Sequence, residues 1–176
     1  MTILEHRKNT KEAKEMTLGF LIKEDKVLLA MKKRGFGVGK WNGIGGKLEI
    51  NEDSESAMKR EAYEEIGIKI LSFRTAGTIT FYDSENVDYK KKPLKVYLYL
   101  IDKWEGTPEE SEEMKPQWFD INTIPFENMW DDDKYWLKLV LSGKIVTSEF
   151  LIDETNNKIL EHIINVKRQI QKANVL

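Results

Sequence analysis

No part of this sequence limits the possible fold as strongly as GGKLEINEDSESAMKREAYEEIG, which runs from Gly45 to Gly67. In an α-helix, Glu61, Glu64 and Glu65 stand at i, i+3 and i+4, so all three project from one face. Like charges at this spacing repel each other, and a hard divalent cation bound by their oxygens would remove the repulsion. The spacing therefore indicates a metal-binding helix face, with a solvated acidic surface as the alternative.

The ends of this helix are also marked in the sequence. Asp53 or Ser54 can serve as the N-cap, and Gly67 is well placed to end the helix. The opposite face carries small or apolar residues that can pack on a sheet: Ala57, Met58, Ala62 and Ile66. The sequence thus predicts an amphipathic helix between a glycine loop and a core.

The rest of the chain reads as short strands and a second helix. Apolar or β-branched runs predict strands at 16–23, 26–31, 68–83, 94–104, 117–120, 144–152 and 158–166. Residues 131–133 are expected to cap a helix that continues to Gly143. This mixture predicts one α+β or α/β domain at 16–166, after a loose polar leader at 1–15 and before a tail at 167–176.

Composition excludes several kinds of chemistry. The chain has no cysteine, so thiol nucleophiles, disulfides and thiolate metal sites are ruled out, and a cytoplasmic location is expected. His6 and His162 each stand alone, which argues against a histidine triad or a zinc site. Any metal is then held by oxygen, as Mg²⁺ or Mn²⁺ would be. The net charge of −2 and the lack of a long apolar run argue against nucleic-acid and membrane partners.

The glutamate segment resembles the signature of the Nudix superfamily, GX5EX7REUXEEXGU, where U is aliphatic. Every fixed position matches: Gly46, Glu52, Arg60, Glu61, Glu64, Glu65 and Gly67. Ala62 is smaller than the usual first aliphatic residue, and Ile68 fills the second. The resemblance implies an α/β/α sandwich with mixed β-sheets and hydrolysis of a nucleoside diphosphate linked to another group.

The same resemblance implies roles for these residues. Metal ligation falls to Glu61, Glu64 and Glu65, helped by the backbone carbonyls of Gly45 and Gly46. Arg60 and Glu52 fit an orienting role in the catalytic set better than ligation. Which glutamate acts as the general base stays open.

Two flanking segments, 26–47 and 106–136, are similar to the MutT-homologue family of oxidised purine nucleoside triphosphatases, and the similarity runs from about Thr17 to Val166. That family implies a purine pocket made by Asn42, Trp130, Asp132 and Asp133. A tryptophan can stack on a base, and two adjacent acids that share a proton can read more than one purine edge. The alternatives are a helix cap for the aspartates and a core position for Trp130.

The resemblance to that family implies site roles for further residues of this sequence. Glu113 matches a loop glutamate that joins the metal site. The remaining substrate-binding candidates are Thr17, Lys32, Phe36, Ile44, Gly45, Gly46, Lys47, Phe81, Met114 and Asp131. Asp131 stands where the family has proline and adds charge beside the base pocket, and Asp83 stands where the family has a second phenylalanine.

The resulting hypothesis is a Mg²⁺-dependent pyrophosphohydrolase of 8-oxo-dGTP and 2-hydroxy-dATP that cleans the nucleotide pool. Its expected partner is a small purine nucleoside triphosphate, and a monomer is expected. One alternative is a Nudix hydrolase of dinucleoside polyphosphates, nucleotide sugars or methylated purine nucleotides. The other is a Nudix module that binds nucleotide without catalysis.

Overall fold

The structure, a computed structural model, describes residues 1–153 and 158–168. The helices are α1 (Ile3–Asn9), α2 (Ser54–Ile66) and α3 (Asp133–Leu141), with a 3-10 turn, η1, at Phe126–Asn128. The strands are β1 (Lys14–Lys23), β2 (Lys26–Lys32), β3 (Trp41–Asn42), β4 (Lys69–Asp83), β5 (Leu94–Glu105), β6 (Met114–Asp120), β7 (Lys144–Asp153) and β8 (Lys158–Arg168). Within the described residues, no helix is long and apolar enough to cross a membrane.

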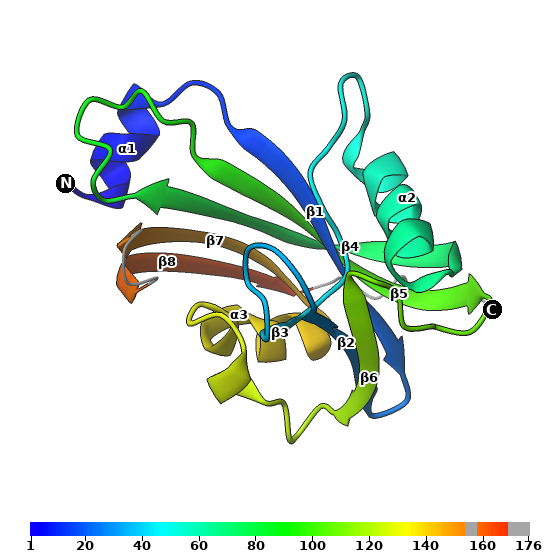
Figure 1. The fold of residues 1–176 in the computed structure, drawn as a ribbon. Helices are drawn as coiled ribbons and strands as arrows, with labels where there is room; N and C mark the ends of the chain where they lie inside the picture. The colour runs from blue at the N-terminus through cyan, green and yellow to red at the C-terminus, as the bar shows by residue number, and fades with distance from the viewer. Residues whose placement is uncertain (154–157, 169–176) are drawn as a thin grey trace, which may run out of the picture.

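All eight strands join one mixed sheet. Its order is β3-β2-β1-β5-β4-β7-β8, and β6 pairs with β2. The β1–β5 and β4–β7 pairs are parallel and the others are antiparallel. Figure 1 shows α2 and α3 on opposite sides of this sheet. The predicted α/β/α sandwich with mixed strands is confirmed.

Two hydrophobic layers follow from the alternation of side chains along the strands. Phe20 points toward α3 and packs edge-on against Trp136, with ring centroids 5.9 Å apart. The next residue, Leu21, points to the other face and joins the layer under α2 with Met58 and Ile66. Since successive residues of a strand face opposite sides, one apolar strand supplies both layers.

The glycine loop before α2 lies alongside β1. β1 and β2 pair only from Leu21↔Leu28 to Lys23↔Lys26, near their hairpin turn. Farther from this turn, toward the start of β1, isolated bridges join Gly19 to Ile44 and Met16 to Lys47. This contact fixes the loop backbone beneath the face of α2 that carries the glutamates.

The sequence predicts α2 closely. Asp53 is the N-cap, because its Oδ1 accepts a hydrogen bond from the backbone N–H of Ser56 at 2.7 Å. Gly67 follows the helix in the left-handed conformation with φ 73°, and its N–H donates to the carbonyl of Tyr63. Both predicted ends of the helix are confirmed.

The expectation of a loose leader is wrong for residues 3–9. They form α1, closed by a capping box in which Thr2 and Glu5 exchange hydrogen bonds. Ile3 and His6 are fully buried, and Ile3 joins a small cluster with Tyr82 and Leu151. The polar appearance of the leader hid these two residues, which need a partner surface that only the folded sheet provides.

The three aspartates at the start of α3, of which Asp133 is its first residue, do not cap it as predicted. Asp132 occupies the N-cap position but has helical backbone angles, and its side chain makes no capping bond. Its Oδ2 instead accepts from the indole Nε1 of Trp136 at 2.9 Å. At the other end of the domain, β8 continues to Arg168, and the predicted tail beyond it lies outside the described residues.

Candidate active site

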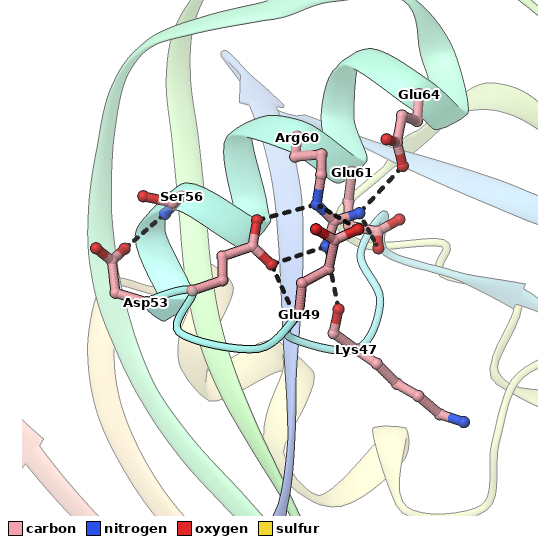
Figure 2. A network of polar contacts seen from close by, with 8 residues as sticks. Lys47, Glu49, Asp53, Ser56, Arg60, Glu61 and Glu64 are labelled. Carbon is pink, nitrogen blue, oxygen red and sulfur yellow. Dashed lines mark hydrogen bonds and ion pairs between the residues drawn. The ribbon is translucent and has the colours of Figure 1, made fainter.

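Arg60 organises the glutamates on one side of α2. Its Nε and Nη2 donate to the two carboxylate oxygens of Glu52 at 2.9 and 3.0 Å, a bidentate contact. Its Nη1 donates to Glu61 at 2.8 Å and to Glu64 at 3.1 Å, and Nη2 also reaches the carbonyl of Lys47. Figure 2 shows the guanidinium between these groups. Charge-assisted, bidentate bonds of this kind fix side-chain orientation.

Glu65 and Glu61 lie in surroundings that disfavour their charge. Glu65 is only 4% exposed, and burial raises its pKa to about 8, although the backbone N–H of Gly45 donates to its Oε2 at 2.9 Å. Burial also raises the pKa of Glu61, against the lowering effect of Arg60. One buried and one half-buried carboxyl on the same helix face are therefore costly to ionise without an added cation.

The glycine loop approaches these carboxyls closely. A Cβ on Gly46 would lie 2.3 Å from Oε1 of Glu61, so any larger residue must displace the carboxylate. The carbonyl of Gly46 accepts from the N–H of Thr17 at 2.9 Å, which holds the loop against β1. The backbone and the carboxylate thus share a space that only glycine leaves open.

The carboxylates surround a cavity of about 220 Å³. It is lined by Arg34, Glu61, Glu64, Glu65, Ser111, Glu112 and Glu113. In the described part of the chain, no group of three or more acidic or histidine side chains has the spacing to hold a metal ion. Arg60 and Arg34 instead hold several of these carboxylates. The donor set, all oxygen and partly buried, fits a hard divalent cation once those carboxylates turn inward.

Trp130 stands at a second, open cavity of about 700 Å³. Phe36 stacks on its ring with centroids 5.0 Å apart, and Lys40 Nζ lies 5.1 Å from the ring centroid. The loop 33–40 carries both contacts, and a Cβ on Gly37 would lie 2.8 Å from the Trp130 ring. This cavity is lined by Lys40, Phe126, Glu127, Met129, Trp130, Asp131, Lys134 and Lys158.

Asp132 and Asp133 are adjacent buried acids behind Trp130. Burial raises the pKa of Asp132 to about 6. Burial and the neighbouring Asp132 charge also raise the pKa of Asp133, whose Oδ2 accepts from the backbone N–H of Trp130 at 3.0 Å. Since two adjacent buried carboxyls resist double ionisation, this pair can both donate and accept hydrogen bonds near neutral pH.

The other predicted site residues divide by their surroundings. Thr17 is buried on β1, and its hydroxyl has no hydrogen-bond partner within the part of the chain that the structure describes. Asn42 on β3 accepts from the N–H of Gly43. Ile44 and Met114 belong to the apolar layer under α2, and Phe81 stacks on Phe150 in the layer under α3. None of these five side chains belongs to the lining of either cavity.

The charged candidates at the edges are placed differently. Lys32 ends β2 near the acidic cavity, where its charge favours the ionised forms of Glu65 and Glu113. Asp131 lines the open cavity and forms an ion pair with Lys134. Asp83 bonds to Lys91 within the loop after β4, at 2.6 Å.

Reasoning from the sequence missed three residues that the structure adds to the site. Arg34 lines the acidic cavity, and its Nη2 donates to Glu113 at 2.6 Å. Lys40 contacts Trp130, and its Nζ donates to the carbonyl of Met129 at 3.2 Å. Trp136 binds Asp132, and the i, i+4 spacing of these two residues was a signal that could have found that pair.

A glycine loop against partly buried carboxylates offers the oxygen donors that a hard divalent cation prefers. The family model described as NUDIX domain matches residues 15–140, and the chain belongs to this family of hydrolases. Nudix hydrolases generally need a divalent metal.

Curated relatives and solved structures agree with this family. The chain is 42% identical over 153 residues to the Danio rerio oxidized purine nucleoside triphosphate hydrolase, covering 85% of this chain and 93% of the relative. It is 42% identical to the Mus musculus protein of the same name, covering 76% and 83%. The crystal structure of a MutT protein from Bacillus halodurans superposes with a TM-score of 0.76 at 23% identity, covering 86% and 97%, and supports the fold.

Proposed function

We propose that this chain hydrolyses oxidised purine nucleoside triphosphates, such as 8-oxo-dGTP and 2-hydroxy-dATP, to the monophosphate and pyrophosphate. The observation that carries the proposal is the loop 33–40, which puts Arg34 at the carboxylate cavity and Phe36 against Trp130. One loop thus adjoins both a cation site suited to phosphates and an aromatic face suited to a base. The names of the two vertebrate relatives support the same substrate class.

At the phosphate end, the proposed ligands of Mg²⁺, or of Mn²⁺ in its place, are carboxylates and backbone carbonyls. They are Glu61, Glu64, Glu65, Glu113 and the carbonyls of Gly45 and Gly46. The bound metal would neutralise phosphate charge as a Lewis acid. Arg60 would stay anchored to Glu52 while Glu61 and Glu64, which it bonds in this structure, turn toward the metal.

A carboxyl whose pKa lies near the working pH is suited to take a proton from the attacking water. Glu65 has a pKa of about 8, and the pKa of Glu61 is also raised, so these two are the candidate bases. Water would attack the β-phosphorus, and the bond between that phosphorus and the oxygen that bridges to the α-phosphate would break. The nucleoside monophosphate would then leave, and the β- and γ-phosphates would form the pyrophosphate. Removing the oxidised triphosphate in this way would keep it out of DNA synthesis.

At the base end, Trp130 would stack on the purine while Asp132, Asp133 and Asn42 bond its edges. Base stacking on an aromatic side chain contributes roughly 1–3 kcal/mol. The proposed lining is completed by Thr17, Lys32, Phe36, Ile44, Lys47, Phe81, Met114 and Asp131. A protonated acid can donate to an added oxygen on the purine, which favours oxidised bases over normal ones.

The test is pyrophosphate release from 8-oxo-dGTP and from dGTP, with and without Mg²⁺, for the wild type and Glu65→Gln. Glu55→Gln is the matched control, because Glu55 is exposed in the first turn of the same helix. We expect selective, Mg²⁺-dependent release from 8-oxo-dGTP that Glu65→Gln abolishes and Glu55→Gln keeps.

The other outcomes each reject a defined part of the proposal. Equal hydrolysis of both nucleotides would keep the hydrolase and reject the preference for oxidised purines. No release from either nucleotide would overturn the proposed substrate class altogether.

A further inference from the structure

Arg34 is the basic residue on the wall of the acidic cavity. Of the described residues that line it, five are glutamates and only Arg34 is cationic. Its Nη2 donates to Oε1 of Glu113 at 2.6 Å, and Nη1 lies 3.6 Å from Oε2 of Glu112. Arg34 lies in the loop 33–40, two residues before Phe36, which stacks on Trp130 at the other cavity.

Arg34 and Arg60 face the same carboxylates under different constraints. Arg60 is half-buried, and all of its donor nitrogens bond to Glu52, Glu61, Glu64 or the Lys47 carbonyl. The Arg34 side chain is 59% exposed and stands next to Gly35, whose φ is 77°. Arg60 is therefore a fixed structural cation, whereas Arg34 can turn without breaking a buried network.

The contact with Arg34 occupies an oxygen that a metal would need. Arg34 holds the pKa of Glu113 below its ordinary range, and the carboxylate faces the same cavity as Glu61 and Glu65. A divalent cation and the guanidinium must then compete for Glu113. A guanidinium displaced from a carboxylate matches phosphate oxygens equally well, because its planar fork of N–H donors suits both.

We propose that Arg34 is a substrate-binding residue that moves from Glu113 to the polyphosphate when metal and nucleotide enter the cavity. Before binding, it screens the repulsion between Glu113 and the α2 glutamates. Afterwards, Glu113 is released to the metal, and the guanidinium bonds non-bridging oxygens of the phosphate chain. This inference rests on the proposed function, since it assumes a substrate with a polyphosphate.

The proposal makes two predictions of opposite sign for Arg34→Ala. Without nucleotide, Mn²⁺ should bind about two- to fivefold more tightly, because the metal no longer displaces an exposed ion pair. With saturating Mg²⁺, inorganic tripolyphosphate should bind roughly tenfold more weakly, because charge-assisted bonds to the phosphate are lost. Arg34→Lys keeps the charge but loses the planar fork of donors. Its affinity for tripolyphosphate should lie between the affinities of the wild type and of Arg34→Ala.

Electron paramagnetic resonance of free Mn²⁺ and calorimetry with tripolyphosphate measure these two affinities. Arg7→Ala is the matched control, because Arg7 is a similarly exposed arginine paired with a glutamate, Glu149, at the end of the sheet where α1 packs. It removes the same charge and should change neither affinity. Weaker Mn²⁺ binding by Arg34→Ala, or unchanged tripolyphosphate binding, would overturn the proposal.

These measurements also separate this inference from the proposed function. Neither probe contains a purine, so both affinities test Arg34 without the base pocket. If both shift as predicted but 8-oxo-dGTP is not hydrolysed, the substrate assignment fails and the role of Arg34 stands. If 8-oxo-dGTP is hydrolysed but the shifts are absent, only the role of Arg34 fails.

Discussion

Asp132→Asn should stabilise this protein above neutral pH while it damages base recognition. Asp132 is 7% exposed, and burial raises its pKa from 3.8 to about 6. The native state therefore holds this proton more tightly than the unfolded chain does. Between these two pKa values, raising the pH lowers the free energy of unfolding, because the folded protein keeps this proton and the unfolded chain releases it.

The size of the effect follows from the two pKa values. The penalty for ionising Asp132 in the folded state is about 1 kcal/mol at pH 4.5 and about 3 kcal/mol at pH 7.5. The asparagine variant cannot ionise, and its amide oxygen can still accept from Trp136 Nε1, which Asp132 binds at 2.9 Å. Its advantage over the wild type should thus grow by about 2 kcal/mol across this range.

Urea unfolding at pH 4.5, 6 and 7.5, in the presence of EDTA, measures this difference. Asp131→Asn is the control, because Asp131 is partly exposed and pairs with Lys134, so it should give no comparable gain. Turnover of 8-oxo-dGTP by the same preparation of Asp132→Asn, assayed separately with Mg²⁺ and without EDTA or urea, should fall. An advantage that stays constant with pH would refute the reasoning that burial of Asp132 controls its ionisation.

Three further changes test other parts of the molecule. Trp130→Ala should raise the KM for 8-oxo-dGTP roughly tenfold through lost stacking, and Trp130→Phe should recover part of it in steady-state kinetics. Gly46→Ala should weaken Mn²⁺ binding roughly tenfold in a titration, because its Cβ would lie 2.3 Å from Glu61 Oε1 and displace that ligand. His6 is fully buried, neither of its ring nitrogens has a hydrogen-bond partner among the described residues, and burial lowers its pKa. Lowering the pH from 7 to 5 should therefore destabilise the wild type but not His6→Leu, and thermal melts that shift equally would contradict this.

Much of α2 could be predicted from local sequence. A cap at Asp53, a left-handed stop at Gly67 and a 3.6-residue period depend only on neighbours along the chain, so the sequence determines them. The positions of most strands could also be predicted, because an apolar or β-branched run is likewise a pattern of neighbouring residues. The family signature indicated which glutamates are candidate metal ligands, and it could do so because its fixed spacing is a pattern of residues close together in the chain.

Other features depended on contacts between distant segments. α1 looked like a loose leader because Ile3 and His6 become core residues only when Tyr82 and Leu151 provide a surface. The hydrogen-bond partner of Asp132 likewise differs from the one that local sequence predicts. Its sequence context suggests a helix cap, but its helical backbone angles aim the carboxylate at Trp136 instead.

The environment of each charge was likewise decided by tertiary structure. Glu64 and Glu65 are neighbours of the same type, yet the packing of α2 leaves the first exposed and buries the second. Arg34 meets Glu113, 79 positions away, because β2 pairs with β6 with Lys32 opposite Met114. Sequence determined which charged groups this protein carries and the local elements that hold them. Only the folded sheet decided which of them lose water and which partners they face, because burial and distance are set by segments far apart in the chain.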